Sequence, residues 1–156
     1  MFLRNLFRKC FLVKEIVSRN GEVHFQRYRL LQLPFFAVYI HYIAKSDEDK
    51  HPHNHPWNFT SIILKGGYKE TVWHKNMLKK LPENEEALWT KKYIRTIWNN
   101  IINDRYAGDY HKIELIKPTW TLVFTGRRLN DDWGYLTETG FKNHIEYRKE
   151  KNAEQI

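Results

Sequence analysis

The sequence predicts an all-β, single-domain fold, either a sandwich or a barrel. Short segments rich in β-branched and aromatic residues alternate with turn residues along most of the chain. Aromatic residues make up 15% of the chain and need a core to fill. The length of 156 residues is that of one domain, which can bury a sizeable core without a disulfide or a structural metal.

The first segment, residues 1–14, places apolar residues at spacings of three and four, with basic residues largely on the other side. This spacing predicts a short amphipathic helix that packs on its own domain. Residues 15–150 form the predicted β domain. Residues 151–156 form a polar tail, and the polar segment from residue 144 onward is expected to fray.

Turn residues divide the β domain into strands. Asn20-Gly21 predicts a hairpin, because this pair readily adopts the positive φ angles of a tight turn. Gly66-Gly67 and Lys117-Pro118 predict two further turns. Residues 75–88 are a predicted charged loop, and residues 88–98 fit a strand or a helix. The predicted strands span residues 14–18, 22–30, 35–44, 60–64, 68–74, 110–116, 119–126 and 133–138.

The chain is basic, since 26 Lys and Arg against 18 Asp and Glu give a formal net charge of +8. Such a charge favours anionic partners, among them nucleic acid, phosphorylated metabolites and membrane surfaces. The single cysteine, Cys10, cannot form an intramolecular disulfide, and nothing resembles a secretory signal, so we expect a reducing, cytoplasmic setting. No apolar run approaches the roughly 20 residues of a membrane-spanning helix.

Histidines carry the main chemical signal. Three of the eight lie within five residues, at His51, His53 and His55. In an extended strand, residues two apart face the same side about 6.5–7 Å apart, so two such imidazoles can bind one ion. His51 and His55 would stand about 13 Å apart in a regular strand. Either the segment bends at a proline, or one of the three histidines lies outside the ligand set.

The wider pattern resembles the cupin superfamily. His53-x-His55 precedes a hydrophobic strand that reaches a turn glycine at Gly66, and Gly108-Asp-Tyr-His111 opens a later strand with another histidine. The segments HNHPWNFTSIILKGGYKE, GDYHKIEL, WTLVFTGRR and WGYLT are similar to small RmlC-like cupins known mostly from phage and bacterial genomes. The resemblance covers residues 36–138. It implies a cupin β-barrel, that is, a double-stranded β-helix or jelly roll.

The resemblance also implies a metal site formed by His53, His55 and His111, with His51 as a further candidate. Cupin sites usually add a glutamate three or four residues after the second histidine, but a phenylalanine and a threonine occupy these places here. Either three histidines hold the ion alone, as in the related thiol dioxygenases, or the site has lost its metal. Imidazole ligands leave Fe(II), Zn(II), Ni(II) and Mn(II) open.

Other side chains near these motifs are candidates for catalysis or substrate contact. Glu70 could replace the missing carboxylate ligand or act as a general base, and Tyr106 is a second catalytic candidate. Arg105 and Arg127 could bind a carboxylate or phosphate at the barrel mouth, or be exposed turn residues. Trp57 could stack on a ring substrate or pack the interior. Residues with a weaker claim are His41, Arg128 and Trp133, with Tyr68, Tyr110 and Trp120 as apolar walls.

Three function classes remain open. The first, which we favour, is a metal-dependent cupin enzyme, dioxygenase-like, acting on a small and anionic substrate. The second is a metal-independent isomerase or epimerase of sugar nucleotides, in which a histidine acts as acid and base. The third is a non-enzymatic module that binds a ligand or nucleic acid; the +8 charge permits nucleic-acid binding, but the basic residues are spread along the chain without a known motif. Cupins often pair through edge strands, which makes a homodimer a further expectation.

Overall fold

The computed structural model describes residues 11–17, 20–47, 49–73, 93–98, 102–129 and 132–153. The elements in this part of the chain are β1 (Leu12–Val17), β2 (Val23–Gln32), β3 (Ala37–Ile43), β4 (Phe59–Trp73), β5 (Tyr93–Trp98), β6 (Ile102–Arg105), β7 (Tyr110–Thr125), β8 (Gly134–Thr137), β9 (Gly140–Asn143) and α3 (His144–Ala153). The predicted all-β fold is confirmed. No helix in these residues is long and apolar enough to cross a membrane.

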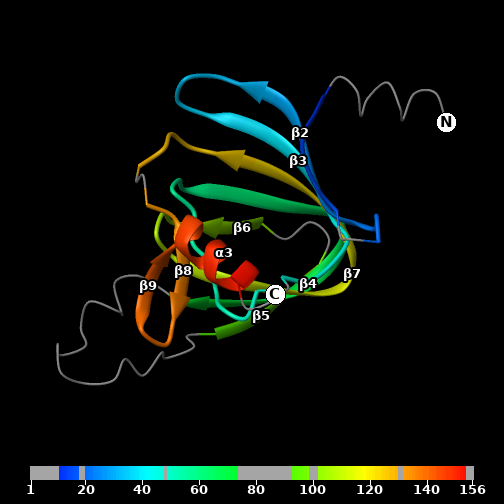
Figure 1. Cartoon of the computed structure of the whole chain (residues 1–156). Coiled ribbons are helices and arrows are strands. Elements are labelled where there is room, and N and C mark those ends of the chain that lie inside the picture. Colours follow the sequence, from blue (N-terminus) through cyan, green and yellow to red (C-terminus); the bar gives the residue numbers. More distant parts are fainter. Residues whose placement is uncertain are drawn as a thin grey trace.

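One antiparallel sheet contains most of the strands. Its order is β1-β2-β3-β7-β4-β5, with β6 also paired to β4, while β8 and β9 form a separate hairpin. Figure 1 shows the sheet curving from β2 and β3 at one end to β4 and β5 at the other. Among the described strands the curve stays open, with β1 and β5 at its two edges.

The β1–β2 hairpin begins the described part of the chain. Gly21, in the connection between the two strands, has a φ of +81°, the conformation that the Asn-Gly turn supplies, and the hairpin prediction is confirmed. Residues 12–14, the end of the predicted helix, belong to strand β1. As part of β1, this segment pairs with β2 through backbone hydrogen bonds, whereas a short helix on its own is only marginally stable. Residues 1–10 lie outside the described residues.

Strands β4 and β7 are long and bent together. The predicted turns at Gly66-Gly67 and Lys117-Pro118 are wrong, because both pairs lie inside these strands of 15 and 16 residues. The pairing of β4 with β7 shifts register around Gly66, which has a φ of +102°. A Cβ atom at Gly66 would lie 2.5 Å from the Pro118 carbonyl oxygen, so only glycine allows this close approach.

On both sides of the bend, β4 and β7 direct side chains into the same interior. The first half of β4 carries Ser61 and the second carries Glu70, and both side chains are buried. Buried Ile63 and Tyr68 pack with partly buried residues of β7 on either side of this bend. Strand β5 pairs with the second half of β4, which decides for a strand over residues 93–98. The predicted loop at residues 75–88 lies outside the described residues.

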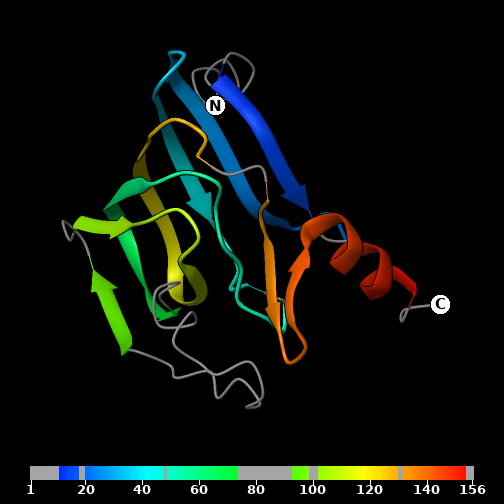
Figure 2. The same ribbon diagram turned by 90° about the vertical axis from the view of Figure 1, so that its left-hand side faces the viewer.

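The C-terminal helix α3 follows the β8–β9 hairpin directly, on the side away from β5 (Figure 2). Residues 144–153, predicted to fray, are helical because Asn143 caps the helix and aromatic stacking holds it. The Asn143 side-chain oxygen accepts a 2.9 Å hydrogen bond from the Ile145 backbone N–H. Tyr147 stacks on Tyr135 with ring centroids 3.9 Å apart. The helix runs past the predicted start of the tail at residue 151; residues 154–156 lie outside the described residues.

Candidate metal centre

The histidine-rich loop between β3 and β4 runs antiparallel to strand β7. The His53 backbone N–H donates to the His111 carbonyl at 3.0 Å, and the His111 N–H donates back to the His53 carbonyl at 2.8 Å. Next along the loop, Asn54 binds Gly134 of β8 through both its backbone N–H and its side-chain oxygen. The loop is thereby fixed between β7 and β8, and two of its histidines, His53 and His55, lie near the beginning of β7.

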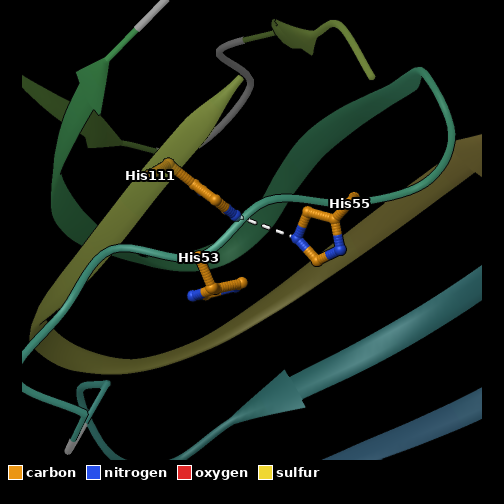
Figure 3. Close-up of side chains that lie close together, drawn as sticks. All are labelled: His53, His55 and His111. Carbon is orange, nitrogen blue, oxygen red and sulfur yellow. Dashed lines mark hydrogen bonds between the residues drawn. The ribbon is translucent and has the colours of Figure 1, made fainter. Parts of the chain in front are cut away.

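The structure brings His53, His55 and His111 together. Figure 3 shows the first two rings reaching from the loop toward the third on β7. One ring nitrogen of each lies within 4.8 Å of the others, and the Nε2 atoms of His55 and His111 are 2.9 Å apart. Metal–nitrogen bonds of roughly 2.0–2.1 Å place neighbouring ligand nitrogens about 3 Å apart. The donor set therefore fits a divalent ion.

Burial favours the neutral imidazole at this cluster. It lowers the pKa of His53 to about 4, with the adjacent His111 acting in the same direction. Burial, followed by the charges of His111 and His53, likewise holds the pKa of His55 well below its usual range. Both rings are neutral near pH 7, which is the protonation state that binds a metal ion.

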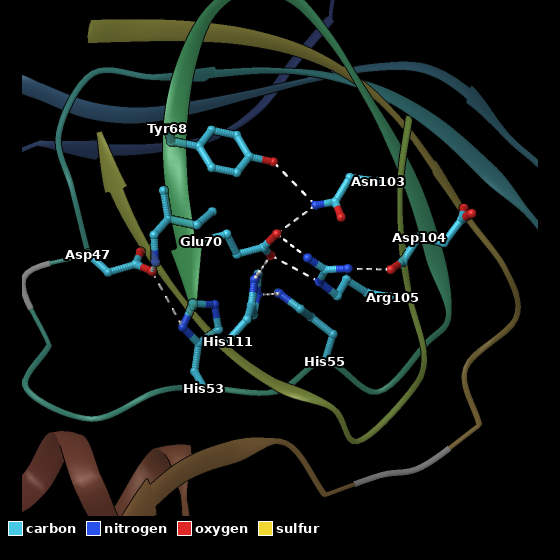
Figure 4. Close-up of polar contacts among 10 residues, drawn as sticks. Asp47, His53, His55, Tyr68, Glu70, Asn103, Asp104, Arg105 and His111 are labelled. Atoms are coloured by element: carbon cyan, nitrogen blue, oxygen red, sulfur yellow. Dashed lines mark hydrogen bonds and ion pairs between the residues drawn. The ribbon is translucent and has the colours of Figure 1, made fainter. Parts of the chain in front are cut away.

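Behind His111 lies the buried carboxylate of Glu70. Its Oε1 atom is 2.7 Å from His111 Nδ1, so the ring N–H donates to the carboxylate and Nε2 keeps its lone pair toward the cluster. Asn103 Nδ2 donates to Glu70 at 2.8 Å, and Arg105 forms two hydrogen bonds to the same carboxylate (Figure 4). Burial alone would raise the pKa of Glu70, but the contacts from His111 and Arg105 bring it to about 2.

These contacts change the expected roles of two residues. Glu70 is a partner of His111 on the side opposite the other rings, and its oxygens are taken up by three donors. Arg105 is 5% exposed and pairs with Glu70, so it does not stand at a mouth to meet substrate. In this structure Glu70 holds the His111 ring, and Arg105 holds the Glu70 carboxylate.

A cavity of about 590 Å³ opens in front of the three histidines. This size is in the range of small-molecule sites. Of the predicted residues, the cavity is lined by His41, His53, His55, Trp57, Tyr68, Glu70, His111 and Trp133. Trp57 also stacks on His55, with ring centroids 6.2 Å apart. An aromatic wall therefore borders the candidate ion site.

Other predicted site residues lie elsewhere. His51 Nε2 is 2.7 Å from Glu138, and its Nδ1 is 3.0 Å from the Tyr147 hydroxyl, so both ring nitrogens point away from the cluster. Tyr106 is 67% exposed in the loop before β7. Arg127 is also exposed, as is Arg128, and neither borders the cavity. Tyr110 and Trp120 do not border it either.

Sequence reasoning missed several cavity residues. Arg27 on β2 lies opposite His41 on β3, and its side chain reaches the same interior. Lys14 and Arg148 border the cavity from β1 and α3. The alternation of VHFQRYRL could have placed Arg27 on the same face as Phe25. The contributions of Lys14 and Arg148 depend on how distant elements pack.

No protein-family model matches the chain, and no curated protein matches its sequence. Solved structures share its fold. The polyketide cyclase RemF from Streptomyces resistomycificus aligns with a TM-score of 0.53 and 12% identity, covering 91% of this chain and 89% of that one. The DMSP lyase DddQ from Ruegeria pomeroyi aligns at 0.52 and 16% identity, and Fe(II) HppE at 0.52 and 10%.

The chain has the cupin fold. This confirms the resemblance to the cupin superfamily at the level of the fold. The chain spans 58% of DddQ and 54% of HppE, which are longer proteins, and these alignments cover 81% and 72% of the chain. Within this fold, one histidine pair from a loop and one histidine from a strand form the group that could hold an ion.

Proposed function

We propose that this chain is a metal-dependent cupin enzyme that acts on a small anionic substrate. The observation that carries the proposal is the convergence of three ring nitrogens, from His53, His55 and His111, within 4.8 Å of one another. Fe(II) HppE, whose fold is similar, holds a divalent iron. An ion bound here would act as a Lewis acid toward a substrate oxygen or bind dioxygen. Fe(II), Zn(II), Ni(II) and Mn(II) all remain candidates for this donor set.

The residues around the cluster support this role. Glu70 orients His111, and the loop contacts to β7 orient His53, so two of the three ligands are held before an ion arrives. Trp57 and Tyr68 border the cavity beside them and give it an aromatic wall. A dioxygenase-like reaction fits three neutral ligands that leave coordination positions for substrate and oxygen.

The test is elemental analysis of the purified protein and its variants. We expect close to one divalent ion per chain, lost in His53→Ala and in His111→Ala. His51→Ala is the matched control, because this histidine belongs to the same loop but binds Glu138 and Tyr147 instead. Retention of the ion by His53→Ala, or its loss from His51→Ala alone, would contradict the ligand set.

One contact favours the second function class. A histidine hydrogen-bonded to a buried carboxylate, as His111 is to Glu70, is also the arrangement of a general base. A metal-independent isomerase would then use His111 for proton transfer. Such an enzyme would keep its activity and its melting temperature after exhaustive chelation. A metal-dependent enzyme would instead lose its activity, and its melting temperature would fall.

A further inference from the structure

The cavity in front of the histidines has a second polar side. Arg27 and His41 face each other on the paired strands β2 and β3, and both border the cavity. The Arg27 Nε–H donates to His41 Nε2 at 3.0 Å, which requires a neutral His41. Burial and the charges of Arg27 and Lys14 lower the pKa of His41 well below its usual range, consistent with that state.

The Arg27 guanidinium is held in one place by its surroundings. Its central carbon lies 5.6 Å from the ring centroid of Phe25 and 5.2 Å from that of Tyr39. With Nε bound to His41, the two terminal nitrogens have no hydrogen-bond partner among the described residues. A planar guanidinium fixed in this way presents two parallel donors, the geometry that binds a carboxylate or a phosphate.

Two further cations stand at the rim of the same cavity. Lys14 on β1 and Arg148 on α3 are exposed and border it, and their charges, with that of Arg27, are close enough to interact. In the described part of the chain, none of Lys14, Arg27 and Arg148 forms an ion pair with a carboxylate. Three positive charges therefore share one opening, and no described carboxylate pairs with any of them.

The acidic groups of the cavity are engaged elsewhere. Glu70 pairs with Arg105 and His111. Asp49 pairs with Lys151 at 2.6 Å, and the Asp47 carboxylate accepts a 2.8 Å hydrogen bond from the Ile113 N–H. The three carboxylates that line the cavity are thus each bound to other groups, whereas the Arg27 guanidinium contacts the neutral His41.

We propose that Arg27, with Lys14 and Arg148 at the rim, binds an anionic oxygen group of the ligand, a carboxylate or a phosphate. The same ligand reaches the three histidines with its other end, a statement that rests on the proposed function. The substrate class is therefore a small molecule with an anionic group remote from the reacting atoms. His41 is a positioning residue that directs the guanidinium into the cavity.

The test is calorimetric titration of chelator-treated protein with inorganic phosphate and, separately, with acetate. We expect at least one of these anions to bind, and the stronger of the two identifies the group. Arg27→Gln should weaken this binding at least about tenfold, because a charge-assisted bidentate contact is lost. Arg29→Gln is the matched control, because Arg29 is an exposed arginine on the same strand and does not border the cavity.

A second pair of substitutions keeps the test independent of Arg27's own packing. Lys14→Gln combined with Arg148→Gln changes two exposed positions and should weaken anion binding about threefold to tenfold while the melting temperature holds. Absence of binding by both anions, or equal binding by Arg27→Gln and Arg29→Gln, overturns the proposal. If Arg27→Gln does not fold, unchanged binding by the rim pair overturns it.

The metal and anion sites can fail separately. His53→Ala should lose its ion by elemental analysis yet bind the anion as before. Arg27→Gln should keep its ion. If the protein binds the anion but never holds a metal, the anion site is supported and the proposed metal-dependent function is contradicted. If it holds an ion but binds no anion, the proposed function is supported and the anion site is contradicted.

Discussion

His111 has a defined tautomer because a buried carboxylate accepts its Nδ1–H. Glu70 is 1% exposed, and three donors surround its two oxygens. A carboxylate in this position makes the opposite ring nitrogen more basic and fixes the ring plane, both of which strengthen a bond from Nε2 to an ion. The contribution of Glu70 is therefore made through His111, although it lies at the wall of the cavity.

Glu70→Gln should weaken metal affinity by about 10-fold to 100-fold, because His111 loses the carboxylate that orients it. The same change leaves the buried Arg105 without its counter-charge, which should cost about 3–5 kcal/mol of the free energy of unfolding. Competition titration with a chromophoric chelator measures the affinity, and urea unfolding measures the stability.

The double variant Glu70→Gln, Arg105→Gln separates these two effects. It removes both buried charges, so much of the lost stability should return. Metal affinity should stay low, since His111 still lacks its carboxylate. Recovery of full affinity in the double variant would mean that Glu70 acts only through folding.

At the scale of single residues, the resemblance to cupins predicts the three converging histidines, whereas spacing alone leaves the choice among His51, His53 and His55 open. The sequence places Glu70 in the site but cannot assign its role, since that depends on which cations reach it. Asn103 and Arg105 both bind Glu70 because they alternate along β6, a strand of four residues. So short a segment carries too few residues for its alternation to be recognised beforehand.

The paired strands β4 and β7 are the elements that connect the site to the rest of the fold. Both bend near Gly66, where the glycine backbone packs against Pro118 and Thr119. The Gly67 backbone N–H also donates to the Thr119 hydroxyl at 2.9 Å, which closes the irregular part of the ladder. Beyond the bend, the strands carry Glu70 and His111 side by side into the cavity wall.

Gly66→Ala should destabilise the protein by about 3 kcal/mol or more, because a positive φ and a clash with backbone atoms act together. The added Cβ would lie 2.7 Å from the Thr119 Cα atom as well as close to the Pro118 oxygen. Gly126→Ala is the control, since its Cβ would meet its nearest neighbour at 3.7 Å. The midpoint of urea unfolding should fall for the first variant and barely move for the second.

Elements with ordinary turn chemistry are predicted correctly, and bends inside long strands are not. Asn20-Gly21 is specific for a tight hairpin. Gly66-Gly67 and Lys117-Pro118 mark irregular backbone, but glycine and proline occur in strand bulges as well as in turns. The irregular backbone at Gly66 in β4 packs against the irregular backbone at Pro118 in β7, so the two strands stay paired through the bend. This match between the two strands is visible only in the structure.

For the whole molecule, removal of the ion should lower the melting temperature. An ion that binds only the folded state adds about 2.7 kcal/mol at a free concentration 100 times its Kd. In a domain of this size, that corresponds to a shift of about 5–10 °C. Differential scanning calorimetry before and after chelation measures it, and His53→Ala, which lacks a ligand, should show no difference. A shift of equal size in that variant would point to a different ion site.

At this scale the alternation of short strands and turn residues predicts an all-β fold, and the resemblance of the histidine and glycine motifs narrows it to the cupin fold. The sequence does not predict the C-terminal helix, because its residues are mostly polar. Aromatic stacking on the β8–β9 hairpin stabilises it instead. The composition shows that the chain is positively charged. It does not show that Lys14, Arg27 and Arg148 border one cavity, because they belong to the three separate elements β1, β2 and α3. Homodimer formation and nucleic-acid binding stay predictions.

The helix α3 also ties down the loop that carries two of the three histidines. Lys151 binds Asp49 at 2.6 Å, and Tyr147 binds His51 at 3.0 Å, so both contacts lie just before His53. These two contacts add to the backbone hydrogen bonds that hold the loop on β7 and β8. We therefore expect loss of the Lys151 and Tyr147 contacts to speed the release of a bound ion, which stopped-flow transfer to a chromophoric chelator would measure.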